Sequence, residues 1–190
     1  MIQYLKSLFF TGTGKDTSIV FAGTLVNVIC GGLFFILAPR ILGPSQYGFF
    51  SVVVATGIMV ANLANFGIDT GILRFVKDND QSSSDRILKL AFQAYLLIGV
   101  TVFILGFLVS SYLANLLGHP NLGPFFKIAF AGIIFLLLTD FFIATLQAKK
   151  QFLKASIVNI SSNLARFLIL VIAAYFFTIN LYFLTILFFF

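Results

Sequence analysis

Glutamate is absent from this 190-residue sequence, and charged residues of all kinds make up only 9% of it. An ordinary soluble domain carries roughly 25% charged residues, so the polar coat of a water-soluble fold is missing. Hydrophobic residues make up 60% of the chain, and 26 of them are phenylalanine. A soluble core of this length has no room to bury so much apolar surface. Lipid is therefore the expected solvent.

Cysteine and histidine each occur once, as Cys30 and His119. A single cysteine excludes an internal disulfide and any cysteine-based metal knuckle, and His119 has no second ligand nearby to complete a metal site. No Ser/His/Asp set and no paired-acid motif occupies a plausible position. We therefore expect no enzyme activity, no cofactor and no metal.

Six apolar runs define the expected architecture, because a hydrocarbon core about 30 Å thick needs about 20 helical residues. Five runs are long enough to cross, and a sixth, 181–190, is still apolar where the sequence stops and is interpreted as a truncated helix. We expect an all-α membrane protein, with residues 1–16 as a cytoplasmic segment and residues 17–190 as an antiparallel bundle of about six transmembrane helices. Short connectors predict that successive helices pack as neighbours. The five complete runs are 17–38, 47–73, 87–113, 125–147 and 155–177.

The net charge of +6 comes from basic residues that lie in short connectors between the runs. This pattern is typical of membrane topology and not of a nucleic-acid surface, so no nucleic-acid partner is expected. Basic residues concentrate before the first run and in the second and fourth connectors, whereas Arg40 is the only one in the first connector. The positive-inside rule then predicts a multi-pass protein of the cell membrane with a cytoplasmic amino terminus.

Arg166 is the most informative residue, because it lies about 16 Å from either end of the 155–177 helix, too far for its side chain to reach the interface. Inserting it costs about 2.5–3.5 kcal/mol, so it should face the bundle interior or a watery cavity. Asn159 and Asn163 recur with it at helical spacing and form a polar stripe. Stripes in other runs suggest a shared substrate cavity whose further candidates are Asn27, Asn62, Asn65 and Asp140.

Two interpretations of Arg166 stay open. The guanidinium meets a phosphate or pyrophosphate by charge-assisted hydrogen bonds, or Asp140 neutralises it, since the two residues lie about 18 and 12 Å above the turn that joins their helices. A third, lipid-facing strain, has the least support. Near the membrane boundary, Arg40, Asp69 and Arg74 are candidates for gating or for an interfacial ion pair.

Two segments carry a family resemblance. Residues 40–50, RILGPSQYGFF, resemble the connector after the first span of polysaccharide flippases, and residues 65–75, NFGIDTGILRF, resemble the ending of their second span. The chain is thus similar over residues 17–90 to the Wzx-like oligosaccharide flippases of the multidrug/oligosaccharidyl-lipid/polysaccharide exporter superfamily. Asn65 stands where that family often has an acidic residue.

The resemblance implies one lobe of a two-lobe, MATE-like transporter that moves polyprenyl-pyrophosphate-linked oligosaccharide by alternating access, with membrane lipids around it. The missing carboxyl-terminal lobe of the same protein would be its partner, and this chain alone would be inactive. A drug or ion antiporter of the superfamily is the alternative, but its cationic substrates require an acidic cavity. A non-transporting component of glycan assembly is another, although such enzymes usually have large external loops.

Overall fold

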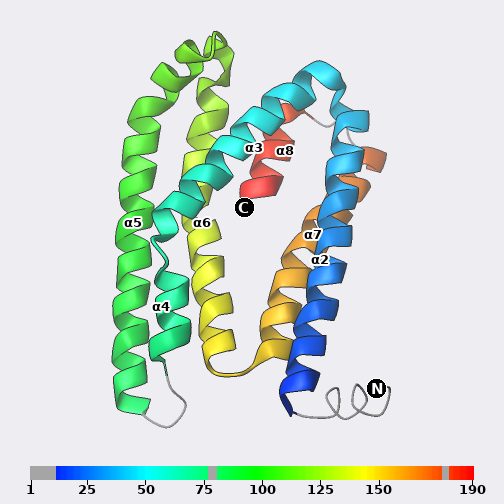
Figure 1. The fold of residues 1–190 in the computed structure, drawn as a ribbon. Coiled ribbons are helices and arrows are strands. Elements are labelled where there is room, and N and C mark those ends of the chain that lie inside the picture. Colours follow the sequence, from blue (N-terminus) through cyan, green and yellow to red (C-terminus); the bar gives the residue numbers. More distant parts are fainter. Residues whose placement is uncertain (1–11, 77–80, 177–179) are drawn as a thin grey trace, which may run out of the picture.

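A computed structural model describes residues 12–76, 81–176 and 180–190, and these are helical almost throughout, with no strand among them (Figure 1). Five helices are long and apolar enough to cross a membrane, which confirms the all-α membrane fold. Residues 1–11 of the expected cytoplasmic segment lie outside the described residues. The elements are α2 (Gly12–Leu42), α3 (Pro44–Asn65), α4 (Ile68–Phe75), α5 (Gln81–Leu116), the 3-10 turn η1 (Pro120–Leu122), α6 (Gly123–Ala148), α7 (Phe152–Phe176) and α8 (Leu181–Phe189).

The second apolar run is not one continuous helix. Phe66 and Gly67 both adopt left-handed backbone, with φ of 48° and 73°, and they separate α3 from α4. Glycine enters this conformation freely, whereas a residue with a Cβ does so at a cost of about 1–2 kcal/mol. A new helix begins at once, because Gly71 donates its backbone N–H to the carbonyl of Gly67. The residue span 47–73 therefore holds two helices joined by a break.

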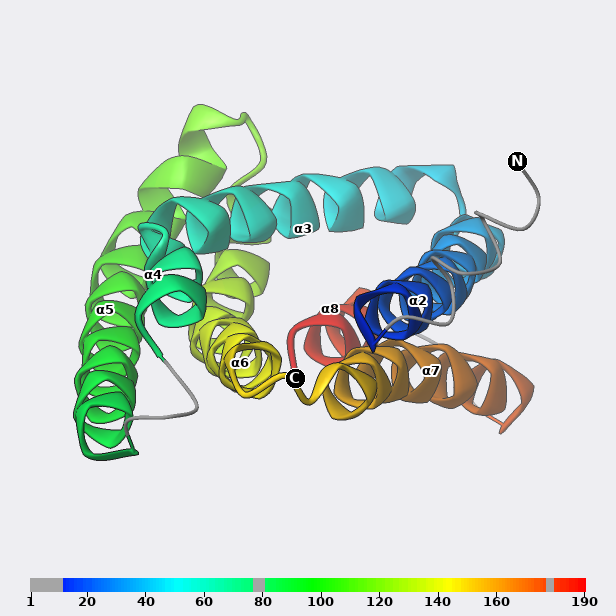
Figure 2. The same ribbon diagram turned by 60° about the horizontal axis from the view of Figure 1, so that its bottom comes forward.

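The helices pack mainly as two pairs, α5 with α6 and α2 with α7 (Figures 1 and 2). The first pair is the antiparallel neighbour pair that short connectors predict. The second pair corrects the expectation, because α2 and α7 are far apart in sequence and run parallel. α3 crosses from one pair to the other and, with α8, also packs against α6.

Glycine allows close contact within both pairs. In the α2–α7 pair, a Cβ on Gly23 would lie 2.8 Å from the Cβ of Ser156. In the α5–α6 pair, a Cβ on Gly106 would overlap the side chain of Phe130. Since lipid provides no hydrophobic drive for helices to associate, such close van der Waals packing is a main source of their attraction.

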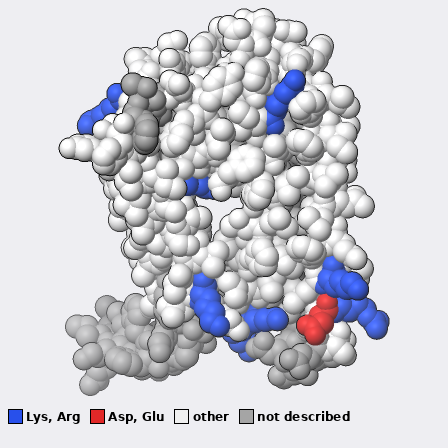
Figure 3. All heavy atoms as spheres, turned by 180° about the vertical axis from the view of Figure 1, so that it is seen from behind, with Lys and Arg blue, Asp and Glu red and all other residues white. Residues whose placement is uncertain are grey.

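Between the two pairs the surface is hollowed, and basic atoms reach the upper edge of the hollow (Figure 3). Most of the other basic side chains gather at the lower end of the molecule, where α4 ends, α5 begins and α6 connects to α7. The connectors that are basic in the sequence therefore lie together at one end of the molecule.

Candidate functional site

Arg166 lies half-buried on α7 and lines a cavity of about 180 Å³ between α6, α7 and α8. Its guanidinium carbon is 5.3 Å from the ring centroid of Phe188 on α8, and this cation–π contact fixes one face of the group. Its Nη1 donates to Oδ1 of Asn163, one turn earlier, at 3.5 Å. This long hydrogen bond orients the guanidinium but leaves its other donors directed elsewhere.

Asn163 extends this contact to the neighbouring helix. Its Nδ2 donates to Oδ1 of Asn27 on α2, so two of the asparagines that the sequence identified meet across the α2–α7 pair. Asn159 lies half-buried one turn further down α7, and its backbone carbonyl accepts a hydrogen bond from the Ser162 hydroxyl at 3.0 Å. We call Asn27, Asn163 and Arg166 the cationic cluster.

The structure does not form the pair between Asp140 and Arg166, which was one of the two interpretations that the sequence left open. Neither side chain has an ion-pair partner within residues 12–76, 81–176 and 180–190, and the electrostatic neighbour of Asp140 is Asp69. The reason is rotation about the α6 axis, since Thr139 lines the Arg166 cavity and Asp140 follows it about 100° around the helix. Asp140 therefore points away from Arg166, and among the described residues no carboxylate compensates the charge of the guanidinium.

A second polar group gathers at the break between α3 and α4. The hydroxyl of Tyr95 on α5 donates to Oδ1 of Asn65, the last residue of α3, at 3.2 Å. Asp69 on α4 and Asp140 on α6 both lie close enough to Tyr95 to interact electrostatically with it. We call Asn65, Asp69, Tyr95 and Asp140 the break cluster. The sequence predicts one cavity shared by these residues, whereas the structure places them in two separate clusters on different helices.

Tyr95 is the residue that the sequence reasoning missed. It is only 1% exposed and is among the largest fully buried side chains. A signal was present, because tyrosine favours the membrane boundary and Tyr95 lies inside the 87–113 run instead of at its end. A phenol at that depth needs a hydrogen-bond partner, and Asn65 supplies it.

Besides Asn159, three other candidates lie outside both clusters. Asn62, Arg40 and Arg74 are exposed, and Arg74 contacts the ring of Phe75 at 5.8 Å. The expected ion pair between Asp69 and Arg74 is not formed, because five residues of helix place them about 140° apart around α4. Asp69 instead lies in the first turn of α4, where its Oδ1 accepts the backbone N–H of Thr70 at 2.7 Å. A carboxylate at this helix end is electrostatically favourable.

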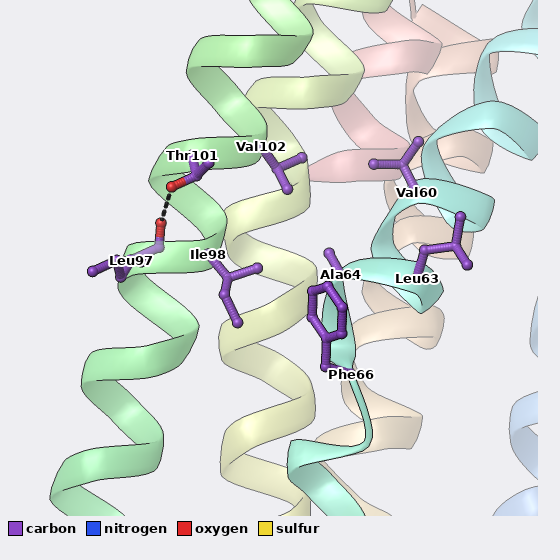
Figure 4. Close-up of a pocket in the computed structure, with 8 residues that line it drawn as sticks. All are labelled: Val60, Leu63, Ala64, Phe66, Leu97, Ile98, Thr101 and Val102. Atoms are coloured by element: carbon purple, nitrogen blue, oxygen red, sulfur yellow. Dashed lines mark hydrogen bonds between the residues drawn. The ribbon is translucent and has the colours of Figure 1, made fainter.

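An apolar pocket of about 330 Å³ adjoins the break, between α3 and α5 (Figure 4). Phe66, Leu63 and Ile98 are among its lining residues. Its one hydroxyl, on Thr101, donates to the backbone carbonyl of Leu97 at 2.8 Å, which uses its only donor within the helix. The pocket therefore offers apolar surface and no directed polar group.

Residues 13–189 match the family of polysaccharide biosynthesis proteins. The chain belongs to this family. The match includes both sequence motifs and the cationic cluster, so the resemblance seen over residues 17–90 is confirmed and extends through all the described spans. Comparison of this polysaccharide biosynthesis protein with curated proteins and with solved structures found no match.

Proposed function

We propose that this polysaccharide biosynthesis protein translocates polyprenyl-pyrophosphate-linked oligosaccharide across the cytoplasmic membrane by alternating access. The observation that carries the proposal is the guanidinium of Arg166, which lies beside a cavity within a membrane span and has no carboxylate partner in the part of the chain that the structure describes. A charge inside the membrane without a counter-ion is costly and marks a functional site by default. A pyrophosphate is the matching ligand, since guanidinium donors are suited to phosphate oxygens. Family membership supports a substrate from polysaccharide synthesis.

The deciding experiment replaces Arg166 with glutamine in this chain, produced together with the proposed carboxyl-terminal lobe, and follows transport of lipid-linked oligosaccharide in cells that lack their own flippase. Losing one charge-assisted hydrogen bond costs about 1.5–3 kcal/mol, so we expect transport to fall roughly 10- to 100-fold. Arg166→Lys keeps the charge but not the forked donors and should retain part of the activity. Lys127→Gln, which removes a positive charge near the Phe107 ring, is the matched control. Full transport by Arg166→Gln would refute the proposal.

A drug or ion antiporter is the second candidate function. The observation in its favour is the break cluster, where Asp69 and Asp140 interact without a basic partner among the described residues. Two neighbouring carboxylates without a basic partner favour a cationic substrate. Efflux of a cationic dye that is lost in Asp140→Asn and unaffected by Arg166→Gln would support the antiporter over the flippase.

We also propose that the basic end of the molecule and the amino terminus face the cytoplasm, following the positive-inside rule. The test places single cysteines at the two ends, Lys149→Cys and Asn121→Cys, after Cys30 has been changed to alanine. Both positions are exposed. A membrane-impermeant maleimide should label Asn121→Cys in intact cells and Lys149→Cys only after permeabilisation. The reverse labelling would invert the orientation.

A further inference from the structure

The polar side chain that contacts Arg166 is a neutral amide. Arginine has donors only, so Asn163 must present its oxygen to the guanidinium and turn its nitrogen away. The nitrogen then donates to Oδ1 of Asn27 on the neighbouring helix. The two hydrogen bonds therefore run in the same direction: Arg166 donates to Asn163, and Asn163 donates to Asn27.

This arrangement has a consequence for charge. An aspartate in place of Asn163 would hold the guanidinium more strongly, because the two opposite charges would attract each other in addition to the hydrogen bond. It would also neutralise the cation that faces the cavity. A carboxamide holds the same group and adds no negative charge, so the full positive charge of Arg166 remains available.

The helix packing holds both asparagines in place. Asn27 lies one turn after Gly23, at which α2 makes its close contact with Ser156, and Asn163 lies two turns after Ser156 on α7. Residues at these spacings share a face of their helices. Asn27 and Asn163 are each half-buried, so the contact between them is partly shielded from solvent.

We propose that Asn163 is a positioning residue, which directs the Arg166 guanidinium toward the cavity while leaving its charge free for an anionic ligand. Asn27 fixes the orientation of the Asn163 amide. This inference rests on the proposed function, because the ligand is the pyrophosphate head group that Arg166 is proposed to bind.

The test measures binding of farnesyl pyrophosphate by calorimetry to the protein in phosphatidylcholine nanodiscs. Asn163→Asp places a carboxylate directly on the guanidinium, and we expect Kd to rise about tenfold or more, a loss of about 1.4 kcal/mol. Asn62→Asp makes the same change at an exposed asparagine that lies outside both clusters. Because that carboxylate is exposed and touches neither Arg166 nor Asn163, Kd should change less than about threefold.

Two results would overturn the inference: wild-type binding by Asn163→Asp, or equal weakening by both aspartate variants. If Asn163→Asp does not fold, Asn163→Ser decides. Its short hydroxyl cannot reach Arg166, so a purely structural role predicts unchanged Kd, whereas positioning predicts weaker binding that Asn163→Gln partly restores.

Arg166→Gln separates the two proposals. If Arg166→Gln binds farnesyl pyrophosphate as the wild type does, the proposed function is wrong. If Arg166→Gln loses binding but Asn163→Asp binds normally, only the role of Asn163 is wrong.

Discussion

Tyr95→Ala is expected to lower the free energy of unfolding by about 3–5 kcal/mol, the usual cost of truncating a buried aromatic side chain. Tyr95 is 1% exposed, and its ring packs edge-on against Phe141 with centroids 6.0 Å apart. Truncation leaves a void among α3, α5 and α6 and removes the donor of Asn65. Reversible unfolding of the purified protein in mixed micelles, by titration with SDS, measures the change.

Tyr95→Phe separates the ring from its hydroxyl. It keeps the aromatic packing and deletes only the hydrogen bond to Asn65, so we expect a loss of about 0.6–2 kcal/mol, as for other polar contacts in membranes. Equal losses for the alanine and phenylalanine variants would show that the hydroxyl, and not packing, dominates. No loss for either would contradict the buried position of Tyr95.

Gly106→Leu is expected to destabilise the α5–α6 pair by about 3 kcal/mol, because over-packing forces neighbours out of low-energy positions. The Cβ of any residue that replaces Gly106 would overlap both the ring and the Cβ of Phe130. The Cβ of Phe130 is attached to the backbone, so rotating the ring cannot relieve the contact. Yield and SDS-induced unfolding both report the effect.

Gly31→Leu is the matched control. Gly31 also lies inside a long membrane helix, but a Cβ there would meet nothing within 4 Å. We expect a change of less than about 0.5 kcal/mol, as for a surface substitution. Similar destabilisation by both variants would mean that loss of glycine itself, and not the contact with Phe130, is responsible.

The fold was largely predictable, because span length and hydropathy are properties of local sequence. The break at Phe66 and Gly67 was not, since hydropathy does not sense backbone conformation and no proline marks the position. The pairing of α2 with α7 was also missed. Connector length restricts which helices are able to be neighbours, but which faces pack depends on close-contact residues such as Gly23, whose partner Ser156 lies far away in sequence.

The candidate site shows the same division. The stripe of Asn159, Asn163 and Arg166 follows from helical periodicity, so the spacing along α7 was predictable. The contact of Asn163 with Asn27 depends on helix rotation in three dimensions, as does the separation of Asp140 from Arg166. A single sequence gives the approximate depth of a residue in the membrane but not the rotation of its helix, so which residues meet across helices could not be predicted.

The interruption between α3 and α4 also affects how force passes through the protein. A continuous span acts as a stiff rod, so tilting one end swings the other. Here α4 is attached to α5 and α6, whereas α3 also contacts α2 and α8. The break at Phe66 and Gly67 interrupts the helical backbone, so we expect a tilt of the short α4 to reach α3 through their shared contacts with α6 and not along a continuous helix. Because α6 contacts both α3 and α4, it is the helix that couples the two parts of this span.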